Sequence, residues 1–203
     1  QAQINPHFLF NTLDSLLFTS MMNNVPVVSD GLAALSHLLR SSILKDNSYT
    51  PLHSELQTVE DYLTLQRIRC CETIVLKTEI SEEAAKASVM RLLLQPIVEN
   101  AFSHGLKACE EGGRILLRVW RQGRMLYVTV ADNGKGMTEE ELAALSEKMR
   151  QSEQTGKSIG LGNIFRRVSM LYPDTGKMQV FSRAGHGTVI RFEIPQGEEE
   201  ERA

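Results

Sequence analysis

Three glycine-rich segments contain the residue types that can surround a phosphate group. They are DNGKG at residues 132–136, the stretch 156–162, and GHGT at residues 185–188. Glycine lets backbone N–H groups approach phosphate oxygens, and a helix that begins after such a loop favours an anion. Two common motifs do not fit, because Gln151 stands where a P-loop ending at 156–158 needs glycine, and residues 160–162 lack the third glycine of a dinucleotide fingerprint. Taken singly, each segment is typical of a turn.

His7 is a candidate nucleophile, because the sequence predicts a helix over 6–22 that would expose it. At about 100° per residue, one side of this helix carries His7, Asn11, Asp14 and Phe18, roughly opposite an apolar stripe. The stripe consists of Leu9, Leu13, Leu16, Leu17 and Ser20 and is expected to enter a bundle. A neutral imidazole nitrogen can attack a phosphoryl group near neutral pH. The histidines at positions 37, 53 and 186 are expected to be structural or merely exposed.

The elements that must position these residues change in character near residue 71. Before it, helices are predicted at 6–22, 28–43 and 52–69, with narrow apolar stripes that favour a bundle completed by a second copy of the chain. After it, strands are predicted at 73–80, 114–121, 125–131, 178–182 and 188–194, and helices at 89–107, 138–150 and 160–171. Thr138 and Glu141 give the helix at 138–150 a capping-box start, and the polar stretch 151–158 is expected to be mobile. The strand pairs favour a mixed or antiparallel sheet, and hence an α/β sandwich.

The chain therefore divides into a helical segment at 1–71, an α/β domain at 72–197 and an acidic tail at 198–203 that is expected to be disordered. The fold class is α+β. The 203 residues carry 22 Lys and Arg against 25 Asp and Glu, which gives no electrostatic case for a nucleic-acid partner. The three cysteines lack zinc-ligand spacing and indicate free thiols in a reducing cytoplasm. No apolar run approaches the ~20 residues of a membrane span, and the start at Gln1 suggests a fragment of a longer protein.

Four motifs follow one another in an order that is far more specific than any one of them. They are LQPIVENA with SHG at residues 94–105, DNGKGM at 132–137, GLGN at 160–163, and Gly187-Thr188. In this order they resemble the N box, the two glycine boxes and the closing segment of the GHKL ATPases, the superfamily of gyrase, the heat-shock chaperone, histidine kinases and MutL. The resemblance covers about residues 72–195. It implies a Bergerat-type α/β sandwich that binds ATP with Mg²⁺.

The first segment resembles a narrower family. Residues 3–13, QINPHFLFNTL, resemble the phosphoacceptor motif of LytS-like sensor histidine kinases. The resemblance continues through Leu38, Leu39 and Arg40, and then through Leu52, Glu55, Glu60, Tyr62, Leu63, Gln66, Arg67 and Arg69. Three positions depart from the pattern: Cys70 replaces an aromatic residue, Met90 replaces a proline, and Phe8 stands where many histidine kinases have an acid.

The resemblance implies catalytic roles near the phosphoacceptor, His7. Because Phe8 supplies no base, Glu99 of the N box is the expected general base, and Asp14 is a weaker candidate. Asn11 lies one helical turn from His7, where its amide could orient a water that dephosphorylates a partner's aspartate.

For the nucleotide, the resemblance implies that Asn100 ligates Mg²⁺ through its side-chain oxygen and that Asp132 accepts the exocyclic amine of adenine. The other expected contacts are Gly134 and Gly136 beneath the base, Gly160, Leu161 and Gly162 at the phosphates beside a lid at 151–158, Thr188 next to Asp132, and His104 and Lys107 as further phosphate contacts. His104 could equally be a partner for the C-terminal end of its helix.

Together these residues predict the core of a two-component sensor histidine kinase. Such a protein transfers a phosphoryl group from MgATP to its own histidine, here His7, and then to an aspartate of a response-regulator protein. Two alternatives remain: a serine kinase of the anti-sigma-factor type, and a nucleotide-binding dimer that signals without phosphoryl transfer. A homodimer is expected, with the chain in the cytoplasm and the full-length protein in the bacterial inner membrane. Plausible hinges are Asn47-Ser48 and the segment 69–72.

Overall fold

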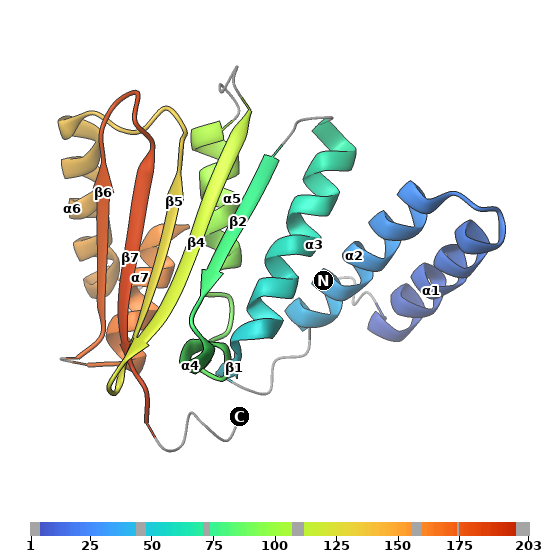
Figure 1. Ribbon diagram of the computed structural model, residues 1–203, viewed down its shortest axis with the longest axis horizontal. Coiled ribbons are helices and arrows are strands. Elements are labelled where there is room, and N and C mark those ends of the chain that lie inside the picture. The colour runs from blue at the N-terminus through green and yellow to red at the C-terminus, as the bar shows by residue number, and fades with distance from the viewer. Residues whose placement is uncertain are drawn as a thin grey trace.

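The computed structural model describes residues 5–43, 48–70, 74–106, 112–155, 160–173 and 175–197. Three helices, α1 (Pro6–Met22), α2 (Pro26–Ile43) and α3 (Leu52–Cys70), precede a five-stranded sheet. Figure 1 shows α1 and α2 at the opposite end of the molecule from α6 and β6, with α3 between α2 and the sheet. Among the described helices, none combines the length and apolar character that a membrane crossing requires.

Helix α1 has the bounds that the sequence predicts. Asn5 caps it by accepting the His7 N–H at 3.0 Å, and the helix begins with a proline, whose missing N–H costs nothing in the first turn. Its apolar stripe is covered only in part within this chain. Leu13 and Ser20 are buried, and Ser20 forms a hydroxyl hydrogen bond of 2.7 Å with Ser29 of α2. Leu16, however, remains 50% exposed in the single chain, and the predicted bundle with a second copy stays a prediction.

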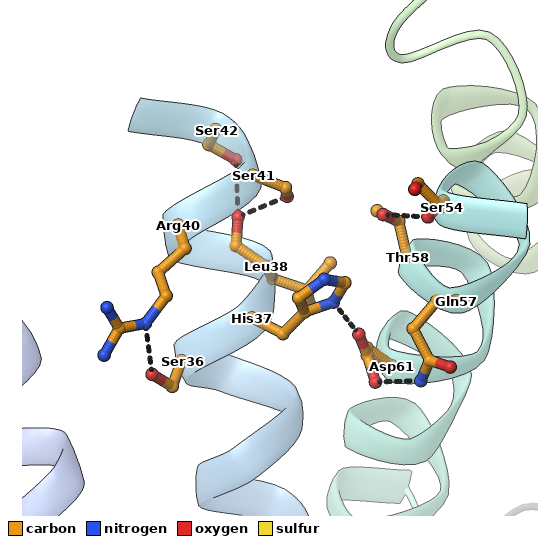
Figure 2. Close-up of polar contacts among 10 residues, drawn as sticks. All are labelled: Ser36, His37, Leu38, Arg40, Ser41, Ser42, Ser54, Gln57, Thr58 and Asp61. Atoms are coloured by element: carbon orange, nitrogen blue, oxygen red, sulfur yellow. Dashed lines mark hydrogen bonds and ion pairs between the residues drawn. The ribbon is translucent and has the colours of Figure 1, made fainter. Parts of the chain in front are cut away.

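Polar side chains join α2 to its two neighbours. His37 Nδ1 pairs with Asp61 of α3, whose other oxygen accepts a hydrogen bond from Gln57 at 3.1 Å (Figure 2). On the other side, Arg40 donates to both oxygens of Asp14 on α1, at 2.8 and 3.2 Å. The Arg40 guanidinium also lies 4.5 Å from the centre of the Phe10 ring. Directional polar contacts therefore fix how α2 sits against α1 and α3.

The sheet has the order β2-β4-β5-β7-β6 and is mixed, as predicted. Its strands are β2 (Ile74–Ile80), β4 (Gly113–Gln122), β5 (Met125–Asp132), β6 (Lys177–Ser182) and β7 (Thr188–Pro195). Only the β2–β4 pair is parallel. The longer helices of this part, α5 (Gln95–Asn100) with its π-helical continuation Ala101–Gly105, α6 (Glu139–Thr155) and α7 (Leu161–Leu171), lie on one face of the sheet (Figure 1), and a short helix, α4 (Glu82–Ala85), follows β2.

The hydrophobic core lies between these helices and the sheet. It includes Phe102 of the π-helix and Phe192 of β7, each fully buried. Helix α3 is part of the same core, because its Leu52, Val59 and Leu63 are also fully buried in it. Tyr62 of α3 packs edge-on against Phe102, with 6.3 Å between the ring centres. The third helix is thus packed into the α/β domain.

Two predicted element bounds are wrong, and one local prediction is confirmed. The helix predicted at 89–107 begins only at Gln95, because residues 88–90 instead form strand β3 (Ser88–Met90), antiparallel to β1 (Tyr49–Pro51). The helix predicted to end at residue 150 continues to Thr155, so part of the stretch 151–158 is helical. The capping box is confirmed: the Thr138 N–H donates to Glu141 at 2.9 Å, and the Glu141 N–H donates to the Thr138 hydroxyl at 3.2 Å.

Candidate active site

Asp132 is the last residue of β5 and pairs with Thr188, the first residue of β7. Its half-buried carboxylate accepts the Gly134 N–H at 2.8 Å and a further hydrogen bond from the Thr188 N–H. Burial raises the pKa of the Asp132 carboxyl above its usual range, and the two N–H donors only partly oppose this. A carboxylate has about four lone-pair positions, so this one can still accept a donor such as an amino group.

The first glycine box packs against the end of the N-box helix with no room for side chains. A Cβ added to Gly134 would lie 2.5 Å from the Cα of Gly105, and the Lys135 N–H donates to the Gly105 carbonyl at 3.1 Å. Gly136 has φ 64°, and a Cβ there would overlap the carbonyl oxygen of Arg183. Three separate segments of the chain therefore meet through bare backbone next to Asp132.

Ser182 is a residue of this site that the sequence reasoning missed. Its hydroxyl lies 2.9 Å from the Thr188 hydroxyl and donates to the Gly187 carbonyl at 2.9 Å. The Met137 N–H donates to the Ser182 hydroxyl oxygen at 2.9 Å. Ser182 thus ties the β6–β7 hairpin to the glycine box. A serine at a strand end is common, so no sequence signal distinguished it.

The N box places Glu99 and Asn100 at the end of α5, and both are half-buried. Glu99 accepts a hydrogen bond of 2.7 Å from Gln95, one turn earlier on the same helix. The Asn100 amide oxygen is a hard ligand of the type that Mg²⁺ prefers, and Mg²⁺ needs only one or two protein ligands when phosphates supply others. The Asn100 amide oxygen therefore fits the Mg²⁺ that the family motif implies.

Helix α7 supplies the second glycine box at its N-terminus. Gly160 is the N-cap residue and provides no side-chain cap, so the first N–H groups of α7 are candidates for phosphate oxygens. Leu161 and Gly162 follow and are buried. Lys107 and residues 156–158 of the predicted lid lie outside the described residues, as does the side chain of His104.

His7 and Asn11 are both exposed on α1, and the Asn11 amide nitrogen lies 3.3 Å from His7 Nδ1. Asp14, the weaker candidate base, is held by Arg40. The structure brings the end of the N box, the first glycine box and Thr188 together around Asp132. It does not bring His7 to them, because α1 lies at the far end of the molecule from β7 (Figure 1).

A five-stranded mixed sheet with an N-box helix and two glycine boxes defines the class of an ATP-binding domain, here joined to a helical segment that carries an exposed histidine. Residues 89–198 match the family of histidine kinase-, DNA gyrase B- and HSP90-like ATPases, and residues 1–74 match the histidine kinase family. The chain belongs to the histidine kinase-, DNA gyrase B- and HSP90-like ATPase family, whose members bind ATP.

Individual relatives agree with this assignment. The chain is 32% identical over 196 residues to the sensor protein kinase HptS of Staphylococcus aureus (strain USA300), covering 96% of this chain and 37% of that protein. Its fold resembles the histidine kinase domain of a blue-light-activated histidine kinase from Erythrobacter litoralis EL346, with a TM-score of 0.52, 17% identity and coverage of 97% and 96% of the two chains. It also resembles the Acinetobacter baumannii histidine kinase AdeS, with a TM-score of 0.51, 14% identity and 96% coverage of each chain.

Proposed function

We propose that this chain is the kinase core of a LytS-like two-component sensor, which autophosphorylates His7 from MgATP and passes the phosphoryl group to an aspartate of a response regulator. The observation that carries the proposal is the pairing of an exposed histidine on α1 with an N box and two glycine boxes in one chain. Phosphoryl transfer needs little beyond positioning and charge neutralisation, which suits a mobile pair of domains.

In the proposed reaction, a ring nitrogen of His7 attacks the γ-phosphorus of ATP and the bond to the β-phosphate oxygen breaks. Asp132 binds the adenine amine, Asn100 would hold Mg²⁺, and the cation would neutralise phosphate charge when bound. Glu99 is the proposed base that accepts the imidazole proton. Asp14 is less suited, because its carboxylate is already paired with Arg40. Gly160, Leu161 and Gly162 would cover the phosphates, together with His104 and Lys107.

Asn11 is the proposed residue for the reverse task, dephosphorylation of the partner's aspartate. Its amide lies beside the His7 ring, so it can orient a water in the position that the imidazole occupies during transfer. Asn11→Ala should lose this phosphatase activity. Unchanged dephosphorylation of the regulator by that variant would contradict the role.

A second copy of the chain is the proposed partner of α1 and α2. Five large apolar side chains stand exposed on α1, where nothing in the single chain covers them within the described residues: Phe8 69%, Leu16 50%, Phe18 65%, Met21 57% and Met22 68%. Surface of this kind marks an interface. The full-length protein is proposed to add a membrane-anchored sensing region, and sedimentation of this chain should give a dimer mass.

Radiolabelled ATP tests the proposed reaction. The chain should acquire an acid-labile, base-stable label that His7→Gln abolishes and that His53→Gln, at another exposed histidine, retains. Acid-stable label on a partner protein would favour the serine-kinase alternative. Nucleotide binding without any label would favour a dimer that signals by conformation alone.

A further inference from the structure

A short loop, residues 91–94, leads into α5, the N-box helix. A buried carboxylate of the helical segment accepts hydrogen bonds from this loop. Glu55 of α3 is only 4% exposed. One of its oxygens accepts the Leu92 N–H at 2.7 Å, and the other accepts the N–H groups of Leu93 and Leu94 at 2.9 and 3.0 Å. Leu94 is the N-cap residue of α5 and has no side-chain cap of its own. Glu55 therefore satisfies backbone donors that no local side chain satisfies.

The loop has a backbone conformation that needs such support. Leu92 has φ 54°, a left-handed conformation that leucine rarely adopts and that persists only where the surroundings hold it. The three hydrogen bonds to Glu55 lie at and directly after this residue. A carboxylate is the one common side chain that can accept all three without presenting a competing donor.

Helix α7 binds the same loop from the other side. Its Arg167 donates to the carbonyl of Leu92 at 3.4 Å and to the carbonyl of Arg91. The positive charge of Arg167 also lies close enough to Glu55 to stabilise the carboxylate, although burial still raises the pKa of Glu55 above its usual range. Because α7 begins at the second glycine box, the loop connects both halves of the phosphate-binding region.

The helical segment reaches the loop through two further contacts. Arg91 donates to the carbonyl of Ser41 near the end of α2, and the Arg91 N–H donates to the carbonyl of Ser48 at 3.0 Å. Strand β3, directly before the loop, pairs with β1, directly before α3. A shift of α2 is thus passed to the start of α5 through Arg91.

We propose that Glu55 is a positioning residue for nucleotide binding, which holds the loop 91–94 so that α5 presents Glu99 and Asn100 to the phosphates and α7 presents its glycine box. The inference rests on the proposed function, because it assigns Glu55 to the same ATP site. Under this proposal, a change in the position of the helical segment reaches the ATP site through the loop 91–94.

The test compares Glu55→Gln with Glu60→Gln in the 203-residue chain. Gln is isosteric with Glu, but its amide group presents N–H donors where the carboxylate accepts, so at least one of the three backbone donors loses its partner. Glu60 lies on the same helix, is exposed, and contacts Arg67 at 3.8 Å. Two quantities are measured: the Kd of a fluorescent ATP analogue, and hydrogen exchange of the amides of residues 92–94.

Glu55→Gln should raise the Kd roughly tenfold, the usual loss when a supporting residue behind a binding group is removed, and it should speed exchange at residues 92–94. Glu60→Gln should change neither. Faster exchange with an unchanged Kd would overturn the inference, as would exchange that stays as slow as in the wild type. A wild-type chain that binds no nucleotide would overturn the proposed function, and the inference with it.

If Glu55→Gln does not fold, Arg167→Lys gives the same test from the other side of the loop. Lysine keeps the charge but loses the forked pair of donors that reaches two carbonyls. The Kd should again rise while far-ultraviolet circular dichroism stays that of the wild type. A folded Arg167→Lys variant with unchanged affinity would overturn the inference.

Discussion

Alanine at Gly187 should damage the fold and the nucleotide site far more than alanine at Gly185, two residues earlier on the same hairpin. Both glycines have a left-handed backbone, with φ 81° and 78°. They differ in their surroundings. A Cβ at Gly185 would have no atom within 4 Å, whereas a Cβ at Gly187 would overlap the Asp132 carbonyl oxygen and lie 2.8 Å from its carbonyl carbon. Comparing the two variants therefore isolates the close approach from the backbone conformation.

The expected magnitudes follow from these surroundings. The left-handed conformation costs a non-glycine residue about 1–2 kcal/mol. Alanine also lowers the conformational entropy of the unfolded chain, which offsets about half of that cost. The net destabilisation expected for Gly185→Ala is therefore about 1 kcal/mol. At Gly187 the obstacle is backbone, which cannot rotate away, so overpacking adds about 2 kcal/mol. For a chain of this size, the added cost should lower the melting temperature by about 4–8 °C relative to Gly185→Ala.

Thermal unfolding and binding of a fluorescent ATP analogue measure the two consequences. Because the displaced carbonyl belongs to Asp132, Gly187→Ala should also weaken nucleotide binding by about tenfold, while Gly185→Ala should leave the affinity near the wild-type value. Equal melting temperatures for the two variants would refute the packing argument. A destabilised Gly187→Ala that keeps full affinity would refute the placement of adenine at Asp132.

Further variants test other contacts of the structure. Asp132→Asn should weaken nucleotide binding by about 100-fold in calorimetry, because it removes the charged acceptor. Since burial raises the pKa of the Asp132 carboxyl, the stability this group contributes is present at low pH and lost as the pH rises through the raised pKa, so the same variant should melt no lower than the wild type at pH 7. Arg40→Ala should cost about 1 kcal/mol in urea unfolding, and a double-mutant cycle with Asp14→Ala should recover part of it as coupling energy. Thr138→Ala should also cost about 1 kcal/mol through the lost cap of α6, whereas Ser146→Ala on the exposed face of that helix should cost almost nothing.

The features that the sequence predicted well are those determined by neighbouring residues. Proline at position 6 and the capping pair at 138 and 141 act within one helical turn, and α1 and α6 begin where these signals stand. The contact between Asp132 and Gly134 is equally local, because it joins residues two positions apart, while the glycine boxes themselves were identified by their resemblance to the GHKL motifs. In each case a short window of sequence contains both partners of the contact.

The features that were missed depend on partners far along the chain. Residues 89 and 90 were predicted to be helical because nothing nearby indicates β1, the strand that pairs with residues 88–90. The left-handed conformation of Leu92 could not be predicted either, because the carboxylate that supports it belongs to Glu55 in α3. Ser182 belongs to the site only because the β6–β7 hairpin brings its hydroxyl next to that of Thr188. Nonlocal pairing overrides local preference at each of these positions.

The two plausible hinges are not equivalent in this structure. A hinge at residues 69–72 would separate α3 from the α/β domain, yet Leu52, Val59 and Leu63 of α3 are fully buried in the core of that domain. Exposing three such side chains would cost about 1.5–3 kcal/mol each, in addition to the hydrogen bonds of Glu55. The apolar part of the contact between α2 and α3 is small, because Ala34 is the one buried apolar residue among the described residues of α2, while Ser29 pairs with Ser20 of α1. Movement of His7 toward the nucleotide should therefore occur between α2 and α3, so that α3 moves together with the ATP site and Glu55 stays in place throughout.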